Sequence, residues 1–285
     1  MYKVLVTGAN GQLGSEIRHI SSAYEFEFIF TDVAELDITN KKSIINFLND
    51  NPVDAIINCA AFTAVDKAEN EVEIADKVNH LAVKYLAEAA NEFKLKFIHV
   101  STDYVFDGEA FSPYSEDDVP NPQSIYGVTK RAGELALISL EVPDSIVIRT
   151  SWVYSVFGNN FVKTMRRFGA EKPLLNVVSD QIGSPTNARD LARCILAILP
   201  KLNTPKTEIY HFSNEGVCSW YDFAVAIMEL SEFECKINPI PSSQYPLPAK
   251  RPFYTVMSKE KIKTDFGVMI PHWRKSLHTC IKSLD

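Results

Sequence analysis

The sequence KVLVTGANGQLG, residues 3–14, decides the fold class of this chain. The apolar run from Tyr2 to Thr7 is typical of a strand buried on both faces of a parallel sheet. Three glycines follow it, and residues 15–22 have helical apolar spacing. Gly8 permits a tight turn, Gly11 lets backbone N–H groups approach a pyrophosphate, and Gly14 lets the helix pack closely on the strand. The order of strand, glycine turn and helix predicts a dinucleotide-binding unit.

The glycine spacing GxxGxxG differs from the GxGxxG of many dehydrogenases, so the prediction needs support from the residues that follow. A second apolar run, residues 26–31, ends in Asp32, about twenty residues after the glycines. An acid at that place can accept hydrogen bonds from an adenosine ribose. Asp32 therefore supports the cofactor prediction and favours NAD over NADP.

Strands and helices continue to alternate as far as residue 150. Helical spacing covers residues 41–49, 71–93 and the segment around Tyr126, and the further strands are predicted at 54–59, 96–101 and 145–150. This alternation predicts an α/β fold with a Rossmann-type doubly wound parallel sheet in residues 1–150.

After residue 150 we expect a smaller, partly interleaved C-terminal α/β lobe, residues 151–285, with parts of 170–212 rejoining the first domain. Helices are predicted at 159–170, 189–199, 221–230 and 273–283, and strands at 175–178 and 209–212. Five prolines between Pro239 and Pro252 exclude a central strand or a helix interior. That segment is predicted to be an ordered loop over a site.

Composition and charge restrict the possible partners. The net charge of −7 argues against a general nucleic-acid or membrane-surface protein, and favours a small metabolite as partner. The five cysteines form no CxxC pair and none of the six histidines has metal-ligand spacing, so we predict no metal site. Free thiols and the lack of a signal-like or membrane-length apolar run predict a cytoplasmic protein.

Four proton-handling side chains follow the predicted strand at 96–101. Thr102 and Asp103 lie at its carboxyl end, where ligands bind in sheets of this type. Tyr126 and Lys130 are four residues apart, so on a helix both side chains lie on one face. A nearby ammonium stabilises a phenolate, which makes the pair a candidate proton donor. The alternatives are a solvated surface pair for Tyr126 and Lys130, and a structural cap for Asp103.

Several longer motifs resemble one known family. They are VTGANGQLG, NCAAFTAVDKAE, STDYVFDG, YGVTK, RTSWVY, GNNFVKTM, DQIGSPT and PLPAKRP. Together, and in this order, they resemble the dTDP-4-dehydrorhamnose reductases of the extended short-chain dehydrogenase/reductase superfamily. The resemblance covers nearly the whole chain.

The resemblance implies NAD(P)H-dependent reduction of the 4-keto group of dTDP-4-dehydro-6-deoxy-L-mannose to dTDP-L-rhamnose, with NADPH or NADH as cofactor. It implies that Tyr126 protonates the alkoxide, that Lys130 holds the nicotinamide ribose and lowers the Tyr126 pKa, and that Thr102 and Asp103 contact the sugar. The implied cofactor-binding residues are Gly8, Asn10, Gly11, Gln12, Leu13, Gly14, Asp32, Asp37, Ile38, Cys59, Ala60, Ala61, Tyr126 and Lys130. The implied substrate-binding residues are Val65, Thr102, Asp103, Tyr126, Trp152, Asn160, Gln181 and Arg251.

The sequence departs from the family at one place. Some members dimerise through magnesium held by glutamates, and Glu16 matches the first of these positions. Arg189 and Ser283 stand where the other glutamates would align, so we expect a monomer or weak homodimer without that metal. Two other functions remain open: a non-catalytic regulatory subunit resembling that of methionine adenosyltransferase, and a related nucleotide-sugar epimerase or dehydratase. For Arg251, a surface arginine in a proline-rich loop is the alternative.

Overall fold

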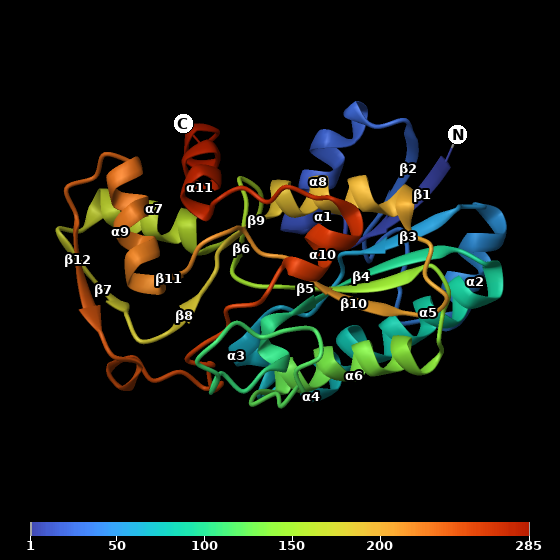
Figure 1. Cartoon of the computed structure of the whole chain (residues 1–285), viewed down its shortest axis with the longest axis horizontal. Coiled ribbons are helices and arrows are strands. Elements are labelled where there is room, and N and C mark those ends of the chain that lie inside the picture. The colour runs from blue at the N-terminus through green and yellow to red at the C-terminus, as the bar shows by residue number, and fades with distance from the viewer. Residues whose placement is uncertain (1, 285) are drawn as a thin grey trace.

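The computed structural model describes residues 2–284 and has a larger and a smaller lobe (Figure 1). The larger lobe is built on a six-stranded sheet in which every neighbouring pair is parallel, in the order β10-β5-β4-β3-β1-β2. Its strands are β1 (Tyr2–Thr7), β2 (Phe26–Thr31), β3 (Ala55–Asn58), β4 (Lys96–Thr102), β5 (Ser145–Thr150) and β10 (Glu208–His211). The predicted α/β class with a parallel sheet is confirmed.

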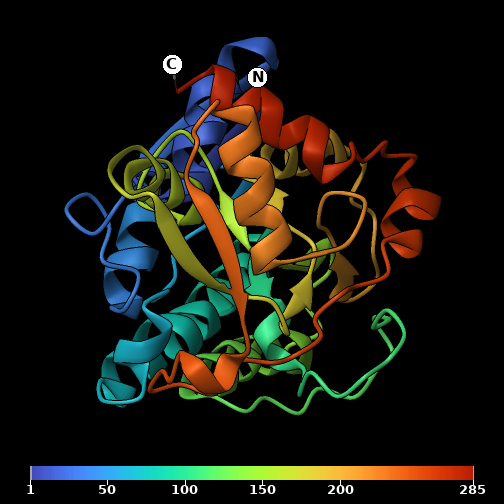
Figure 2. The same ribbon diagram turned by 90° about the vertical axis from the view of Figure 1, so that its left-hand side faces the viewer.

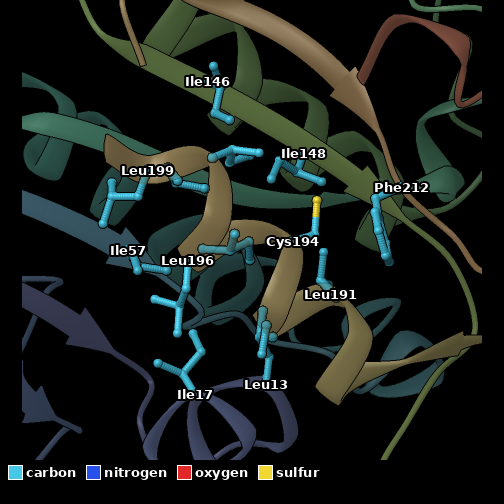
Figure 3. Packing of buried hydrophobic residues seen from close by; sticks show 14 of the residues in the cluster. Leu13, Ile17, Ile57, Ile146, Ile148, Leu191, Cys194, Leu196, Leu199 and Phe212 are labelled. Atoms are coloured by element: carbon cyan, nitrogen blue, oxygen red, sulfur yellow. The ribbon is translucent and has the colours of Figure 1, made fainter. Parts of the chain in front are cut away.

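Helices cover both faces of this sheet because its strands are apolar on both sides. The helices of one face are α1 (Gln12–Ile20) and α8 (Ala188–Ile198), and those of the other are α2 (Lys41–Asp50), α5 (Ala82–Phe93) and α6 (Ile125–Ser139) (Figure 1). Alternate strand residues divide between the faces: Val4 and Val6 pack with the first group, and Leu5 with the second. Figure 3 shows the first face, where Ile57 and Ile148 meet α1 and α8.

Strand β10 and helix α8 belong to the large lobe although they follow residue 151 in the chain. Strand β10 pairs in parallel with β5, and Leu191 and Ile195 of α8 are fully buried against the sheet. Burying a side chain of this size stabilises a fold by about 1.5–3 kcal/mol. The two lobes are therefore interleaved along the sequence.

The smaller lobe has its own apolar core, in which Phe223, Ile227 and Leu277 are fully buried. Its larger elements are α7 (Phe161–Glu171), β7 (Leu174–Val178), α9 (Trp220–Leu230), β12 (Lys236–Ile240) and α11 (Trp273–Lys282). Figure 2 shows β7 and β12 side by side against α9, and the two strands pair in parallel. The shorter elements of the whole chain, in both lobes, are α3 (Val65–Ala68), α4 (Val72–Asp76), β6 (Val153–Tyr154), β8 (Ile182–Gly183), β9 (Thr186–Asn187), β11 (Cys218–Ser219) and α10 (Glu260–Phe266).

Two sequence predictions are wrong in part. The proline-rich segment is not entirely a loop, because Pro239 lies inside β12; a two-stranded sheet has only edge strands, which tolerate proline. The helix predicted over 71–93 is interrupted by a π-helical turn, Lys77–Leu81, between α4 and α5. Within residues 2–284, no helix has the length and hydropathy needed to cross a bilayer.

Candidate active site

The strand order of the large sheet reverses between β1 and β3, which is where sheets of this type bind ligands. A cavity of about 620 Å³ opens at the carboxyl ends of these strands. It is lined by Gly8, Gly11, Asp32, Val33, Leu36, Asp37, Ile38, Thr39, Cys59, Ala60, Ala61, Phe62, Ile74, Lys77 and Val78. Eight of the predicted cofactor-binding residues therefore line one cavity: Gly8, Gly11, Asp32, Asp37, Ile38, Cys59, Ala60 and Ala61.

The glycine loop has the shape that a pyrophosphate requires. Gly8 has φ +65°, and a Cβ there would lie 2.6 Å from backbone atoms of Ala60. A Cβ on Gly14 would lie 2.5 Å from the Gly8 carbonyl oxygen, which is too close for any residue with a side chain. Helix α1 therefore packs this closely against the loop only because residue 14 is glycine. Helix α1 starts directly after Gly11 and points its N-terminus at this loop. The cavity, the glycine cradle and the helix end together fit a dinucleotide.

Among the predicted cofactor residues, Asp32 lies at the cavity wall, whereas Gln12 and Leu13 lie elsewhere. The Asp32 carboxylate accepts hydrogen bonds from the backbone N–H of Asn10 (3.0 Å) and Val33 (2.9 Å), which fixes it at the cavity wall. Leu13, by contrast, packs in the core of the sheet, and the Gln12 side-chain oxygen accepts a 3.0 Å hydrogen bond from Asn160. Leu13 and Gln12 therefore do not line the cavity.

Sequence reasoning missed Phe62 and Asn79, which shape the cavity wall. The buried Asn79 side chain accepts a 2.8 Å hydrogen bond from the Phe62 N–H and donates one of 3.1 Å to the Phe62 carbonyl. Asn79 lies in the π-helical turn, which places its side chain toward the loop after β3. Helical periodicity carries no signal for this contact, because it depends on an irregular turn.

Thr102 and Asp103 are buried at the carboxyl end of β4. The Thr102 hydroxyl donates to Asp103 Oδ1 (3.1 Å) and accepts from the Tyr104 N–H (3.2 Å), which caps a short 3₁₀ turn. Burial raises the pKa of Asp103 from 3.8 to about 6, against the opposing effect of the Thr255 and Thr102 hydroxyls. Asp103 is therefore half protonated near pH 6 and mostly ionised at pH 7.

Helix α6 places Tyr126 beside Thr102. Ser124 caps the helix by accepting from the Gly127 N–H, and a Cβ on Gly127 would lie 2.2 Å from the Tyr104 carbonyl oxygen. The resemblance implies a lowered Tyr126 pKa, but burial raises it to about 12, against the opposing effect of a hydrogen bond with Thr102. Tyr126 is therefore a phenol that holds its proton at neutral pH.

Lys130 is 1% exposed and lies one helical turn after Tyr126. Its Nζ donates a 2.7 Å hydrogen bond to the Val100 carbonyl oxygen and lies 3.4 Å from Nε2 of His99. Burial lowers the pKa of Lys130 to about 8, although the Glu134 carboxylate and Cys59 act in the opposite direction. The lysine is thus able to gain or lose a proton near neutral pH.

Trp152 and Trp220 form a stacked pair near the predicted sugar site. Their ring centroids are 3.7 Å apart and their planes differ by 12°. Trp152 has φ +48°, which is rare for a bulky residue, and a Cβ on Gly183 would lie 2.8 Å from its ring. Val65 begins α3, and Gln181 donates a 3.0 Å hydrogen bond to the Ser242 hydroxyl.

Asn160 and Arg251 have protein partners in the ligand-free structure. Asn160 caps α7 by accepting from the Lys163 N–H. The Arg251 guanidinium binds the Asp66 carboxylate in a bidentate pair, at 2.6 and 2.7 Å. Arg251 therefore joins the proline-rich loop to α3.

Glu16 does not line this cavity, and its carboxylate accepts hydrogen bonds from an arginine and a serine hydroxyl. Arg189 Nε donates to one Glu16 oxygen (2.9 Å), and the Ser155 hydroxyl donates to the other (2.6 Å). The Arg189 guanidinium thus lies beside the Glu16 carboxylate, and Arg189 is the residue that we align with a second glutamate of some family members.

Comparison with known proteins agrees with this geometry. The model of the family described as RmlD substrate binding domain matches residues 2–285. The dTDP-4-dehydrorhamnose reductase of Aggregatibacter actinomycetemcomitans is 42% identical, over 97% of each chain. A crystal structure of a dTDP-4-dehydrorhamnose reductase from Clostridium acetobutylicum is 43% identical, with a TM-score of 0.95 and 99% of each chain covered. One from Bacillus anthracis in complex with NADP is 35% identical, with a TM-score of 0.94, and covers 99% of this chain and 100% of its own.

Proposed function

The chain belongs to the dTDP-4-dehydrorhamnose reductase family, and we propose that it reduces the 4-keto group of dTDP-4-dehydro-6-deoxy-L-mannose to dTDP-L-rhamnose with NADPH or NADH. One observation carries the proposal. A cavity of about 620 Å³ with a glycine cradle lies on the same sheet edge as a buried Thr102–Asp103 pair and the Tyr126–Lys130 helix face. Binding and proton transfer would then occur at one place.

The residues that would hold the cofactor are those of the cavity. Gly8, Gly11 and the N-terminus of α1 would bind the pyrophosphate, and Asp32 the adenosine ribose. A bound reduced nicotinamide supplies a hydride to the carbonyl carbon. As negative charge then grows on the former carbonyl oxygen, Tyr126 supplies a proton to that oxygen, and Thr102 donates a hydrogen bond to it.

Residues of the loops and the smaller lobe would hold the nucleotide sugar. Trp152, kept in place by Trp220, would pack against the sugar, and Asp103 would contact a sugar hydroxyl. Arg251 presents a planar fork of donors that matches a phosphate oxygen pair, so a diphosphate could compete with Asp66 for it. Asn160 and Gln181 are polar groups of the same region that the family resemblance assigns to the nucleotide diphosphate.

The test follows NAD(P)H absorbance while the dTDP-4-keto-6-deoxy sugar is generated in the same vessel by its upstream enzymes. We expect oxidation of NADPH or NADH that depends on the sugar. Tyr126→Phe should abolish turnover, because it removes only the proton donor, and should leave NAD(P)H binding nearly unchanged. A Tyr126→Phe variant with near-normal turnover would contradict the assigned role, and failure of the wild-type protein to oxidise either cofactor would contradict the proposed function.

A further inference from the structure

A buried chain of hydrogen bonds crosses three strands and ends at Lys130. The Thr7 hydroxyl lies 2.7 Å from Asn58 Oδ1, Asn58 Nδ2 lies 3.1 Å from His99 Nδ1, and His99 Nε2 lies 3.4 Å from Lys130 Nζ. Asn58 and His99 are fully buried, on β3 and β4 respectively. The chain therefore joins the start of the glycine turn to the lysine through side chains that are at most 2% exposed.

Backbone geometry fixes the direction of this chain. The Ala60 N–H donates a 3.1 Å hydrogen bond to Asn58 Oδ1, so this atom is the amide oxygen and the Asn58 NH₂ group faces His99. An NH₂ group can only donate, so Nδ1 of His99 must accept. A neutral imidazole with an accepting Nδ1 carries its proton on Nε2, and Nε2 is the atom that faces Lys130.

The charge state of His99 is consistent with this tautomer. Complete burial and the nearby Lys130 charge lower the pKa of His99 well below its ordinary value, so the ring is neutral. The Nε2–H group then points at Lys130 Nζ. An ammonium cannot accept this hydrogen bond, whereas a neutral amine accepts it with its lone pair and still donates to the Val100 carbonyl.

We propose that His99 is a positioning residue that stabilises the neutral amine of Lys130, so that the ammonium gives up its proton toward Tyr126 more readily. This inference rests on the proposed function. When Tyr126 has protonated the alkoxide, one proton leaves the Lys130 ammonium and restores the Tyr126 phenol. The amine that remains is the form that the His99 N–H holds, and it regains a proton from solvent between turnovers.

Other charged and titratable groups face Lys130, and the test must separate His99 from them. Glu134 lies on the same helix as Lys130, and Cys59 follows β3. Glu134 favours the ammonium, and the Cys59 thiol is neutral because burial raises its pKa to about 12. His99 is thus the neighbour that presents a donor to Nζ.

The first measurement uses the ligand-free full chain labelled with ¹⁵N-histidine. Long-range ¹H–¹⁵N spectra distinguish the two tautomers, and the His99 signals are those that His99→Leu lacks. We expect the Nε2–H tautomer in the wild type. Asn58→Asp replaces the amide donor by a carboxylate, so Nδ1 should become the protonated atom. An Nδ1–H ring or an imidazolium in the wild type at pH 7 would overturn the proposal.

The second measurement is the pH dependence of the reductase rate. The alkaline limb should mark loss of the Lys130 proton, so both Asn58→Asp and His99→Leu should move it upward by about one pH unit, or about tenfold in proton affinity. Phe97→Leu, which disturbs packing on the same face of β4, is the control and should leave the limb in place. An unmoved limb in both test variants would refute the role of His99. The spectra need no substrate, so their result is independent of whether the proposed reaction is correct.

Discussion

Replacing Asp103 with asparagine should stabilise the ligand-free protein, and the gain should grow with pH. The Asp103 side chain is 2% exposed, and within residues 2–284 its Oδ2 has no hydrogen-bond partner. Burial raises its pKa from 3.8 to about 6. Asparagine has nearly the same shape and keeps the oxygen that accepts from Thr102, but it never carries a buried charge.

The sign and size of the effect follow from the raised pKa of Asp103. Because the folded protein binds this proton more tightly than the unfolded chain, the carboxyl group costs no stability below about pH 3.8. The cost increases as pH rises between 3.8 and about 6 and is constant above that range. One pKa unit corresponds to 1.36 kcal/mol, so Asp103→Asn should gain about 1.6 kcal/mol at pH 5 and about 3 kcal/mol at pH 8.

Urea unfolding of both proteins between pH 5 and pH 8 measures this difference. Asp107→Asn is the matched control, because hydrogen bonds from the Glu109 N–H and the Tyr114 hydroxyl hold the Asp107 pKa below its ordinary value. Relative to the wild type, the Asp107→Asn variant should therefore become less stable as pH rises. An Asp103→Asn variant that is destabilised, or whose gain is the same at pH 5 and pH 8, would refute the reasoning.

Two further substitutions test the packing behind the site. Gly127→Ala should lower the free energy of unfolding by about 1–3 kcal/mol and reduce the turnover rate, because a Cβ 2.2 Å from the Tyr104 carbonyl oxygen pushes α6 away from β4. Urea unfolding and steady-state rates measure the two effects, and unchanged values would exclude the close contact. Glu134→Gln should destabilise the protein by about 3–5 kcal/mol in urea unfolding, because the fully buried Arg149 loses the carboxylate that its Nε and Nη2 contact at 2.9 and 2.8 Å. A loss of stability below about 1 kcal/mol would show that the pair is dispensable.

Local spacing was enough to predict the glycine turn, the parallel sheet and the helix of Tyr126 and Lys130. Gly14 was informative because its close contact with the Gly8 carbonyl oxygen lies within one strand-turn-helix unit, and Gly8 because the turn itself gives it a φ of +65°. The catalytic roles of Tyr126 and Lys130 remain predictions. The segment with Pro239 was predicted to be a loop because sequence alone does not distinguish an edge strand from a loop.

Other features depend on residues that are far apart in the chain. The pairing of Arg251 with Asp66, the stacking of Trp152 on Trp220 and the contact of His99 with Lys130 each join different elements. No periodicity of 2 or 3.6 residues encodes such contacts, because they depend on how the packed elements face one another.

The sequence by itself therefore determined the class of fold, the family and the residues able to move a proton. Only the tertiary structure decided the state of those residues. Tyr126 and Lys130 lie four positions apart in any helix, but their pKa values are about 12 and about 8 here because packing removes water from both side chains. Burial is a property of the assembled layers, and for that reason it could not be derived from the chain alone.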